Sequence, residues 1–161
     1  MATRNIRVFD DEILRKKCKD VKEVTPRTQE LIDDMFETMY EAFGVGLAAS
    51  QVGVLKRIVT IDIGEMPIVL INPEILEVSG EQTDMEGCLS FPGKIGQVTR
   101  ANYVKVKAFD RNMNEIVLEG EGLFARAVLH ECDHLDGQVY IDKVEGELMN
   151  TADLEEEDDV E

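Results

Sequence analysis

Two histidines and a glutamate stand close together in the last third of the chain. The segment from His130 to His134 reads His-Glu-Cys-Asp-His and contains the only two histidines of the 161 residues. On a helix that turns about 100° per residue, positions four apart lie about 40° apart around the axis, so both imidazoles share one face. Two neutral imidazoles at this spacing can bind one metal ion, and Glu131 beside them can accept a proton from water. The segment therefore predicts a catalytic metal site.

A catalytic metal site usually has three protein ligands and one open position for water. In one peptidase class the third ligand is a histidine after a glycine, but here Gly137 is followed by Tyr140 where that histidine would stand. In another class the third ligand is a glutamate on a later helix, which in this chain would fall in the acidic C-terminal run. Neither histidine nor glutamate is therefore the expected third ligand.

The three cysteines are the remaining candidates for the third ligand. Cys132 lies about 200° from His130 around the helix, so we expect it to be a small buried apolar residue. Cys18 lies in a charged run, and we expect a half-exposed thiol without a role. Cys88 lies in a loop bounded by Gly87 and Pro92, which can direct a thiolate inward. Because an odd number of cysteines in unlike settings does not indicate disulfides, a reducing compartment is expected.

The elements that must position these side chains follow from the apolar pattern. Thr25 can cap a helix that begins at Pro26 and stops at Gly44, and a second helix is expected from Leu123 to Asp136. Short runs rich in valine and isoleucine predict strands at 57–63, 67–71 and 74–78, a loop at 84–93, and a hairpin of 103–109 and 115–118. The predicted fold is α+β, with short antiparallel strands packed around a C-terminal helix that carries the two histidines, plus an N-terminal amphipathic helix.

Length and charge restrict the organisation and the partners. We expect one catalytic domain, residues 1–150, followed by an acidic and disordered tail, residues 151–161. The formal net charge of −17 repels phosphate backbones and anionic lipids, so neither nucleic acid nor a membrane is an expected partner. No apolar stretch reaches the roughly 18 residues of a membrane span, and no signal peptide is evident. The expected location is the cytoplasm.

Three motifs together give a strong resemblance to the peptide deformylase family. They are Gly-Val-Gly-Leu-Ala-Ala-Ser-Gln at 44–51, Glu-Gly-Cys-Leu-Ser at 86–90, and His-Glu-Cys-Asp-His at 130–134. Their order and spacing match that family, and the similarity extends over about residues 5–143. The resemblance implies that Cys88, His130 and His134 bind the metal. It also implies that the substrate is the N-formyl-methionine end of a newly made polypeptide, from which formate is released.

The same resemblance assigns roles to residues around the metal. Glu131 would accept the proton of water at the metal and then protonate the departing amine. The side-chain amide of Gln51 and the backbone N–H of Leu89 would stabilise the developing oxyanion. The family implies Fe²⁺, although a Cys-His-His set also accepts Zn²⁺, Ni²⁺ or Co²⁺.

A set of residues is predicted to bind the formyl-methionyl peptide. Gly44 and Gly46 have no side chains, so a peptide backbone could approach them closely and hydrogen-bond as an added strand would. Leu123 and Ala127 lie on the metal-facing side of the second helix, where family members form the methionine pocket, although core packing explains both equally well. The predicted substrate-binding residues are Gly44, Val45, Gly46, Glu86, Leu123 and Ala127.

Two features of the sequence depart from the family pattern, and two functions other than deformylation remain as alternative hypotheses. Leu129 stands where many members have glutamine, and we expect only local repacking there. The acidic C-terminus does not suit the basic helix with which some members dock on the ribosome, so any ribosome contact is expected to be transient. The alternatives are a zinc endopeptidase and a non-catalytic structural metal site, although a structural site usually closes all four metal positions with cysteine or histidine.

Overall fold

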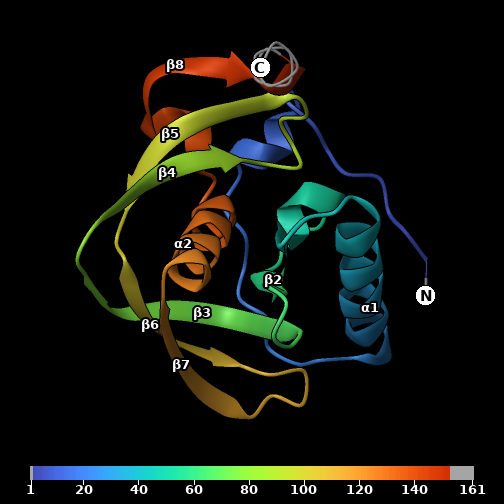
Figure 1. The fold of residues 1–161 in the computed structure, drawn as a ribbon. Helices are drawn as coiled ribbons and strands as arrows, with labels where there is room; N and C mark the ends of the chain where they lie inside the picture. The colour runs from blue at the N-terminus through green and yellow to red at the C-terminus, as the bar shows by residue number, and fades with distance from the viewer. Residues whose placement is uncertain (1, 153–161) are drawn as a thin grey trace.

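The computed structural model describes residues 2–152 and contains two helices and eight strands in that part of the chain (Figure 1). In chain order the elements are the 3-10 turn η1 (Glu12–Arg15), α1 (Pro26–Glu41), β1 (Gly46–Ala48), the 3-10 turn η2 (Ala49–Val52), β2 (Ile58–Ile61), β3 (Ile68–Ser79), β4 (Gln82–Gly87), β5 (Lys94–Arg100), β6 (Tyr103–Phe109), β7 (Glu115–Glu121), α2 (Leu123–Leu135), the 3-10 turn η3 (Tyr140–Lys143) and β8 (Val144–Asn150).

Two antiparallel sheets lie on either side of helix α2. The larger sheet has the strand order β1-β2-β3-β6-β7, and the smaller has the order β4-β5-β8. Helix α2 runs between the sheets, while α1 lies beside β1 and β2 on the outside of the molecule (Figure 1). The predicted α+β fold, with antiparallel strands around the late helix, is confirmed.

One face of α2 is buried against the larger sheet. Val128, Cys132 and Leu135 pack in one apolar cluster with Val104 and Val106 of β6. Each fully buried aliphatic side chain contributes about 1.5–3 kcal/mol relative to exposure. This packing fixes the rotation of α2 about its axis, so the opposite face of the helix points toward the smaller sheet.

Helix α1 begins as the sequence predicts but ends earlier. The Thr25 hydroxyl accepts a hydrogen bond from the Thr28 N–H at 3.2 Å, and Pro26 occupies the first helical turn. The helix ends at Glu41 rather than at Gly44. The left-handed residue that follows it is Phe43, with φ of 59°, and not a glycine.

The strands predicted at 67–71 and 74–78 form one strand, β3, which is interrupted by an irregularity in its register. Asn72 takes a left-handed φ of 52° at this point. Its side chain accepts from the Val21 N–H and donates to the Val21 carbonyl, both at 2.8 Å, so it replaces the missing strand pairing. The hairpin predicted from 103–109 and 115–118 is confirmed as β6 and β7.

The loop predicted at 84–93 is wrong over its first part. Residues 82–87 form β4, which pairs with β5, and β8 extends the same sheet. Strand β4 has mostly polar and exposed side chains, and β8 is mostly exposed as well. Neither therefore shows the alternation of apolar residues by which strands are recognised. The sequence did not predict β1 either, because a strand of three residues is too short to show a periodic pattern.

The prediction for Cys18 is wrong. Its side chain is buried in the cluster between α2 and the larger sheet, and its backbone N–H donates to the Leu135 carbonyl at 2.8 Å. The neighbouring Lys17 and Lys19 are exposed. Because side chains in an extended segment alternate between two sides, a charged run can contain a buried position.

In the described part of the chain, neither helix has both the length and the apolar character needed to cross a membrane. The predicted acidic tail at 151–161 lies, from residue 153 onward, outside the described residues.

Candidate metal centre

Helix α2 presents both histidines on the face that points away from the larger sheet. His130 and His134 are buried, and their ring centroids lie 5.0 Å apart. Cys88 follows β4 in a turn that is closed by a hydrogen bond from the Phe91 N–H to the Cys88 carbonyl at 2.9 Å. The turn points the thiol toward α2, and its Sγ lies 3.2 Å from His134 Nε2.

The three predicted ligands therefore come together in space. The donor atoms of Cys88, His130 and His134 all lie within 4.8 Å of one another. Cys132 lies on the other side of α2, where burial raises the pKa of its thiol to about 12. Among the three cysteines, Cys88 alone belongs to this group of potential metal ligands in the described part of the chain.

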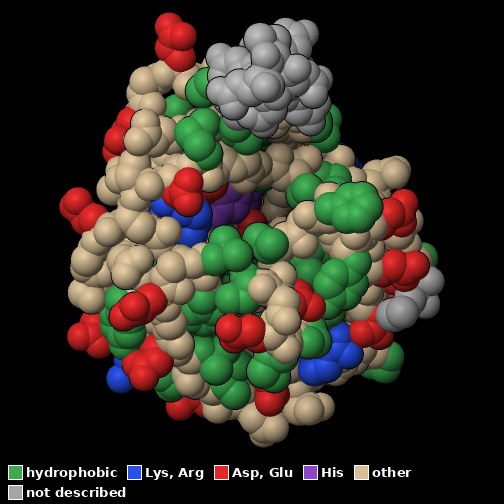
Figure 2. Space-filling view, viewed as in Figure 1, with side chains coloured by type: hydrophobic (Ala, Val, Ile, Leu, Met, Phe, Trp, Pro, Cys, Tyr) green, Lys and Arg blue, Asp and Glu red, His purple; other side chains and the backbone are tan. Residues whose placement is uncertain are grey.

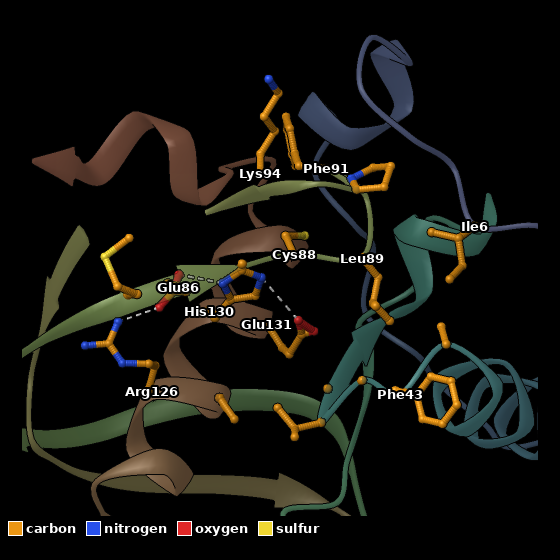
Figure 3. A pocket seen from close by; sticks show the side chains of 18 of the residues that line it. Ile6, Phe43, Glu86, Cys88, Leu89, Phe91, Lys94, Arg126, His130 and Glu131 are labelled. Atoms are coloured by element: carbon orange, nitrogen blue, oxygen red, sulfur yellow. Dashed lines mark hydrogen bonds and ion pairs between the residues drawn. The ribbon is translucent and has the colours of Figure 1, made fainter. Parts of the chain in front are cut away.

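Glu86 orients the His130 ring through a hydrogen bond at Nδ1. Glu86 Oε2 lies 2.7 Å from His130 Nδ1, which leaves Nε2 of the ring on the side of Cys88 and Glu131 (Figure 3). The same carboxylate accepts two hydrogen bonds from Arg100, at 2.7 and 2.6 Å, and one from Arg126 at 2.8 Å. Burial alone would raise the pKa of Glu86, but its hydrogen bonds with Arg100 and His130 hold it well below its usual value. The carboxylate is therefore ionised and directs the histidine ring.

The two arginines were not found by sequence reasoning. Arg100 comes from β5 and also donates to Asp133 at 3.0 Å, while Arg126 comes from α2 and donates to the Val98 carbonyl at 3.0 Å. Arg126 precedes His130 by four residues on the same helical face, and that spacing is the one signal that could have identified it.

The charges around the two histidines suit a bound cation. Burial favours the neutral form of His130, yet its hydrogen bonds with Cys88 and Glu86 and the charge of Glu131 raise its pKa to about 10. Burial, reinforced by the charge of His130, holds the pKa of His134 well below its usual value. His134 is therefore neutral. The negative groups that hold a proton on His130 would stabilise a metal cation at the same place, and binding of the metal would release that proton. The residues present thus fit a divalent metal ion.

Glu131 has an unused acceptor atom beside the metal ligands. Its side chain is buried, Oε1 lies 3.6 Å from His130 Nε2, and Oε2 has no hydrogen-bond partner within residues 2–152. Burial raises the pKa of this carboxyl to about 7. A carboxyl group in this environment can both accept and return a proton near neutral pH.

The two predicted oxyanion donors differ in whether they already make hydrogen bonds. Gln51 lies in η2, and its Nε2 donates to Ser90 Oγ at 3.0 Å and points to Cys88 Sγ at 3.6 Å. Its Oε1 accepts from the Ala48 N–H at 2.9 Å, which fixes the orientation of the amide. The Leu89 N–H makes no hydrogen bond within the described residues.

A pocket of about 590 Å³ leads to this site. Figure 2 shows the histidine atoms inside a hollow in the middle of one face of the molecule. This volume lies in the range of about 300–1,000 Å³ that is typical of small-ligand sites. Every predicted substrate-binding residue lines it: Gly44, Val45, Gly46, Glu86, Leu123 and Ala127. The carboxylate of Glu86, however, is already hydrogen-bonded to His130, Arg100 and Arg126.

The two glycines make room for residues of the site itself. A Cβ atom on Gly46 would lie 3.0 Å from Glu131 Cγ, and one on Gly44 would lie 2.6 Å from Leu89 Cδ1. The contact at Gly44 is closer than real Cβ atoms approach, so the Leu89 side chain would have to move, and the contact at Gly46 is tight enough that Glu131 would have to shift by a few tenths of an ångström. These contacts give both glycines a structural reason besides the approach of a peptide.

A Cys-His-His donor set beside a buried carboxylate, at the base of an open pocket, is the arrangement of a metal-dependent hydrolase. Comparison with known proteins identifies the family. A polypeptide deformylase family model matches residues 3–149. The chain therefore belongs to the polypeptide deformylase family, whose members are metal-dependent hydrolases, and the resemblance predicted from the three motifs is confirmed.

Individual relatives support the same assignment over nearly the whole chain. The chain is 63% identical to a peptide deformylase of Agathobacter rectalis, over 94% of this chain and 96% of that protein. A peptide deformylase of Lachnoclostridium phytofermentans is 60% identical over 99% of both chains. Among solved structures, the peptide deformylase of Thermotoga maritima has a TM-score of 0.88 at 41% identity, covering 91% of this chain and 100% of that one.

One similar structure carries a bound inhibitor. The peptide deformylase of Synechococcus elongatus, in complex with actinonin, has a TM-score of 0.87 at 38% identity and covers 91% of this chain and 81% of that one. The family match favours a deformylase over the zinc endopeptidase and the structural metal site that the sequence had left open.

Proposed function

We propose that this protein removes the formyl group from the N-formyl-methionine of newly made polypeptides and releases formate. The convergence of the Cys88, His130 and His134 donor atoms within 4.8 Å, beside the free carboxylate oxygen of Glu131, supports this proposal most directly. The membership of the chain in the deformylase family supplies the reaction. The cytoplasm, where formylated chains are made, is the proposed location.

Cys88 Sγ and the Nε2 atoms of His130 and His134 are the proposed metal ligands. A bound divalent ion lowers the pKa of a coordinated water and polarises a carbonyl oxygen. We propose Fe²⁺ from the family resemblance, with Zn²⁺, Ni²⁺ or Co²⁺ as replacements, because a mixed thiolate and imidazole set accepts all four.

Glu131 is the proposed general base and general acid. Its free Oε2 accepts a proton from water, and the same group returns the proton to the amine that departs from the formyl carbon. A pKa raised by burial to about 7 is consistent with both steps, because neither protonation state is then strongly favoured. Gly46 supports this role, since it leaves the space that the Glu131 side chain occupies.

The Leu89 N–H is the first proposed donor to the developing oxyanion, because it makes no other hydrogen bond in the described part of the chain. Gln51 is the second. The Gln51 Nε2 atom lies 3.6 Å from Cys88 Sγ, so this hydrogen bond is weak. The same N–H could instead donate to a charged oxygen, which forms a stronger hydrogen bond. The contact with Ser90 would keep the amide oriented during this exchange.

The formyl-methionyl peptide is proposed to lie along residues 44–46. Its methionine side chain would enter the apolar part of the pocket, which is lined by Val45, Leu123 and Ala127. Glu86 contributes to this site by orienting His130 rather than by contacting the peptide, in view of its hydrogen bonds. We further propose that residues 1–150 form the single catalytic unit, that the acidic 151–161 segment is not part of it, and that any ribosome contact is transient.

A coupled measurement of formate and metal tests the proposal. Protein purified without oxygen should contain about one divalent metal ion per chain and should release formate from formyl-Met-Ala-Ser. Casein, tested in parallel, should remain intact. Bound metal without formate release would refute the proposed function, and casein cleavage without deformylation would indicate an endopeptidase.

A further inference from the structure

The turn that ends α1 has a phenylalanine at a position that favours glycine. The Phe43 N–H donates to the Tyr40 carbonyl at 3.1 Å, and the Gly44 N–H donates to the Met39 carbonyl at 2.9 Å. These two hydrogen bonds form the Schellman motif, in which the residue after the C-cap is left-handed. Phe43 takes this conformation, with φ of 59°. Glycine is usual here because a Cβ atom is unfavourable in the left-handed region.

Packing does not explain the phenylalanine. Its side chain is 95% exposed, so it buries almost no apolar surface in the described protein. The apolar contact that often accompanies this motif belongs to the next residue, which is Gly44 and has no side chain. A single exposed apolar residue is common, but exposure combined with an unfavourable backbone conformation is not, and such combinations concentrate at functional sites.

Phe43 lies at the outer end of the pocket. It lines the cavity together with Ile6, and Figure 3 shows its ring on the far side of Leu89 from His130. The segment that carries Ile6 is fixed by a hydrogen bond from the Arg7 N–H to the Gln51 carbonyl at 2.6 Å. On the third side, Phe91 packs edge-on against Tyr140 with ring centroids 5.4 Å apart. The outer end of the pocket is thus apolar, and its walls are already held in place.

We propose that Phe43 is a specificity-determining residue, which binds an apolar side chain in one of the two residues that follow the formyl-methionine. This inference rests on the proposed deformylase function. With the formyl group at the metal, an extended peptide advances about 3.3 Å per residue, so two further residues reach about 7 Å beyond the methionine. They extend from the metal toward the outer end of the pocket, where Phe43 and Ile6 offer aromatic and aliphatic surface.

Initial rates on four peptides test this proposal: formyl-Met-Ala-Ser, formyl-Met-Phe-Ser, formyl-Met-Ala-Phe and formyl-Met-Asp-Ser. The better of the two phenylalanine peptides should exceed formyl-Met-Ala-Ser by about 3- to 10-fold in kcat/KM, mainly through a lower KM, as expected for one aromatic pair. The aspartate peptide should be the poorest substrate. Phe43→Gly should bring the ratio of the phenylalanine to the alanine peptide close to one, and Phe43→Tyr should retain it.

A stability measurement separates this role from a structural one. Phe43→Gly should unfold at the same temperature as the parent or higher, because glycine suits the left-handed turn. Met113→Gly is the control for the peptide ratio alone, since Met113 has φ of 60° in the turn between β6 and β7, does not line the pocket and packs against an apolar cluster. It should leave the ratio between the peptides unchanged.

Three results would overturn the proposal while leaving deformylation intact. They are similar kcat/KM values for all four peptides in the parent protein, a preference that survives in Phe43→Gly, and an equal fall of kcat for every peptide in that variant with KM unchanged. Formate release from none of the peptides would instead refute the proposed function on which the inference rests.

Discussion

Glu131 combines burial with an unused oxygen, and both properties depend on its neighbours. Gly46 leaves the space for its side chain, and the core packing of α2 determines where it points. Burial raises its pKa by removing water from the carboxylate. The residue is therefore suited to proton transfer by its surroundings and not by its chemical type alone.

Glu131→Gln should abolish most of the turnover while the metal stays bound. The amide keeps the shape of the side chain but cannot accept the proton, and general acid–base catalysis contributes about 10²- to 10⁴-fold. Formate release and metal content should be measured on the same sample. The exposed Glu30 of α1 offers a control, Glu30→Gln, that should retain both properties. Activity close to that of the parent in Glu131→Gln would show that another group is the base.

Cys88→Ser and Cys132→Ser should affect different properties. Replacing Cys88 removes the thiolate ligand, so the Co²⁺-loaded protein should lose its sulfur-to-metal absorption band. Replacing Cys132 puts a hydroxyl into an apolar cluster and should lower the free energy of unfolding by about 1–3 kcal/mol without changing that spectrum. Equal spectral effects of the two substitutions would contradict the choice of Cys88.

Glu86→Gln should weaken metal binding without removing a ligand. The variant loses the charged partner of His130 Nδ1, and the loss of such a partner typically reduces metal affinity by about 10- to 100-fold. Competition with a chelator of known affinity measures the change. Glu81→Gln, an exposed position just before β4, is the control and should match the parent. Unchanged affinity in Glu86→Gln would show that other contacts suffice to orient the ring.

At the scale of the elements, the sequence predicts what depends on a repeated pattern. Helices α1 and α2 and the β6–β7 hairpin show apolar periodicity or turn residues, and all three form. The smaller sheet could not be foreseen, because β4 and β8 expose most of their side chains and are held by pairing with β5. Pairing between distant strands leaves no local trace in such polar segments.

In the candidate site, too, the sequence predicts what depends on a local pattern and misses what depends on contacts between distant segments. The convergence of His130 and His134 was predictable because one helix sets their spacing, and Cys88 was chosen as the third proposed ligand by exclusion of the other cysteines. The role of Arg100 could not be predicted from the sequence. Arg100 on β5 contacts Glu86 on β4, and that contact exists only once the two strands are paired. The turn after α2 depends in a similar way on a distant segment, because Gly137 packs against the backbone near Arg15.

Gly137→Ala should destabilise the protein more than Gly146→Ala. Both glycines are left-handed, with φ of 77° and 80°, so both substitutions carry a conformational cost of about 1–2 kcal/mol. At Gly137 the new Cβ would also overlap the Arg15 carbonyl oxygen, whereas at Gly146 nothing lies within 4 Å. Thermal or urea unfolding measures the difference. Equal losses would mean that the two chain segments can separate at little cost.

The whole molecule carries 34 acidic and 17 basic residues, and yet two of its arginines lie together behind the proposed metal ligands. Arg100 and Arg126 neutralise Glu86 and connect β5 and α2 to β4. The remaining surface is strongly negative, which attracts divalent cations and accelerates their binding at low ionic strength. Because the proposed ligands come from both the β4–β5 turn and α2, a metal ion bound to them would also join the smaller sheet to the helix.

Removing the metal should therefore lower the stability of the whole molecule. A ligand present at 100 times its dissociation constant stabilises the folded state by about 2.7 kcal/mol. For a chain of this size, that corresponds to about 5–10 °C in the unfolding temperature. Calorimetry before and after chelation measures the shift, and His134→Ala should show almost none. A parent protein that loses its metal without any shift would contradict the coupling.

The segments that form the mouth of the pocket come from three separate stretches of the chain. Ile6 belongs to the N-terminal segment, Phe43 to the turn after α1, and Phe91 to the turn after β4. Most of the proposed metal ligands and the proposed base, Glu131, lie instead on α2. On the proposed function, substitutions at this mouth can change which formyl-methionyl peptides are preferred while the proposed metal ligands and Glu131 stay in place.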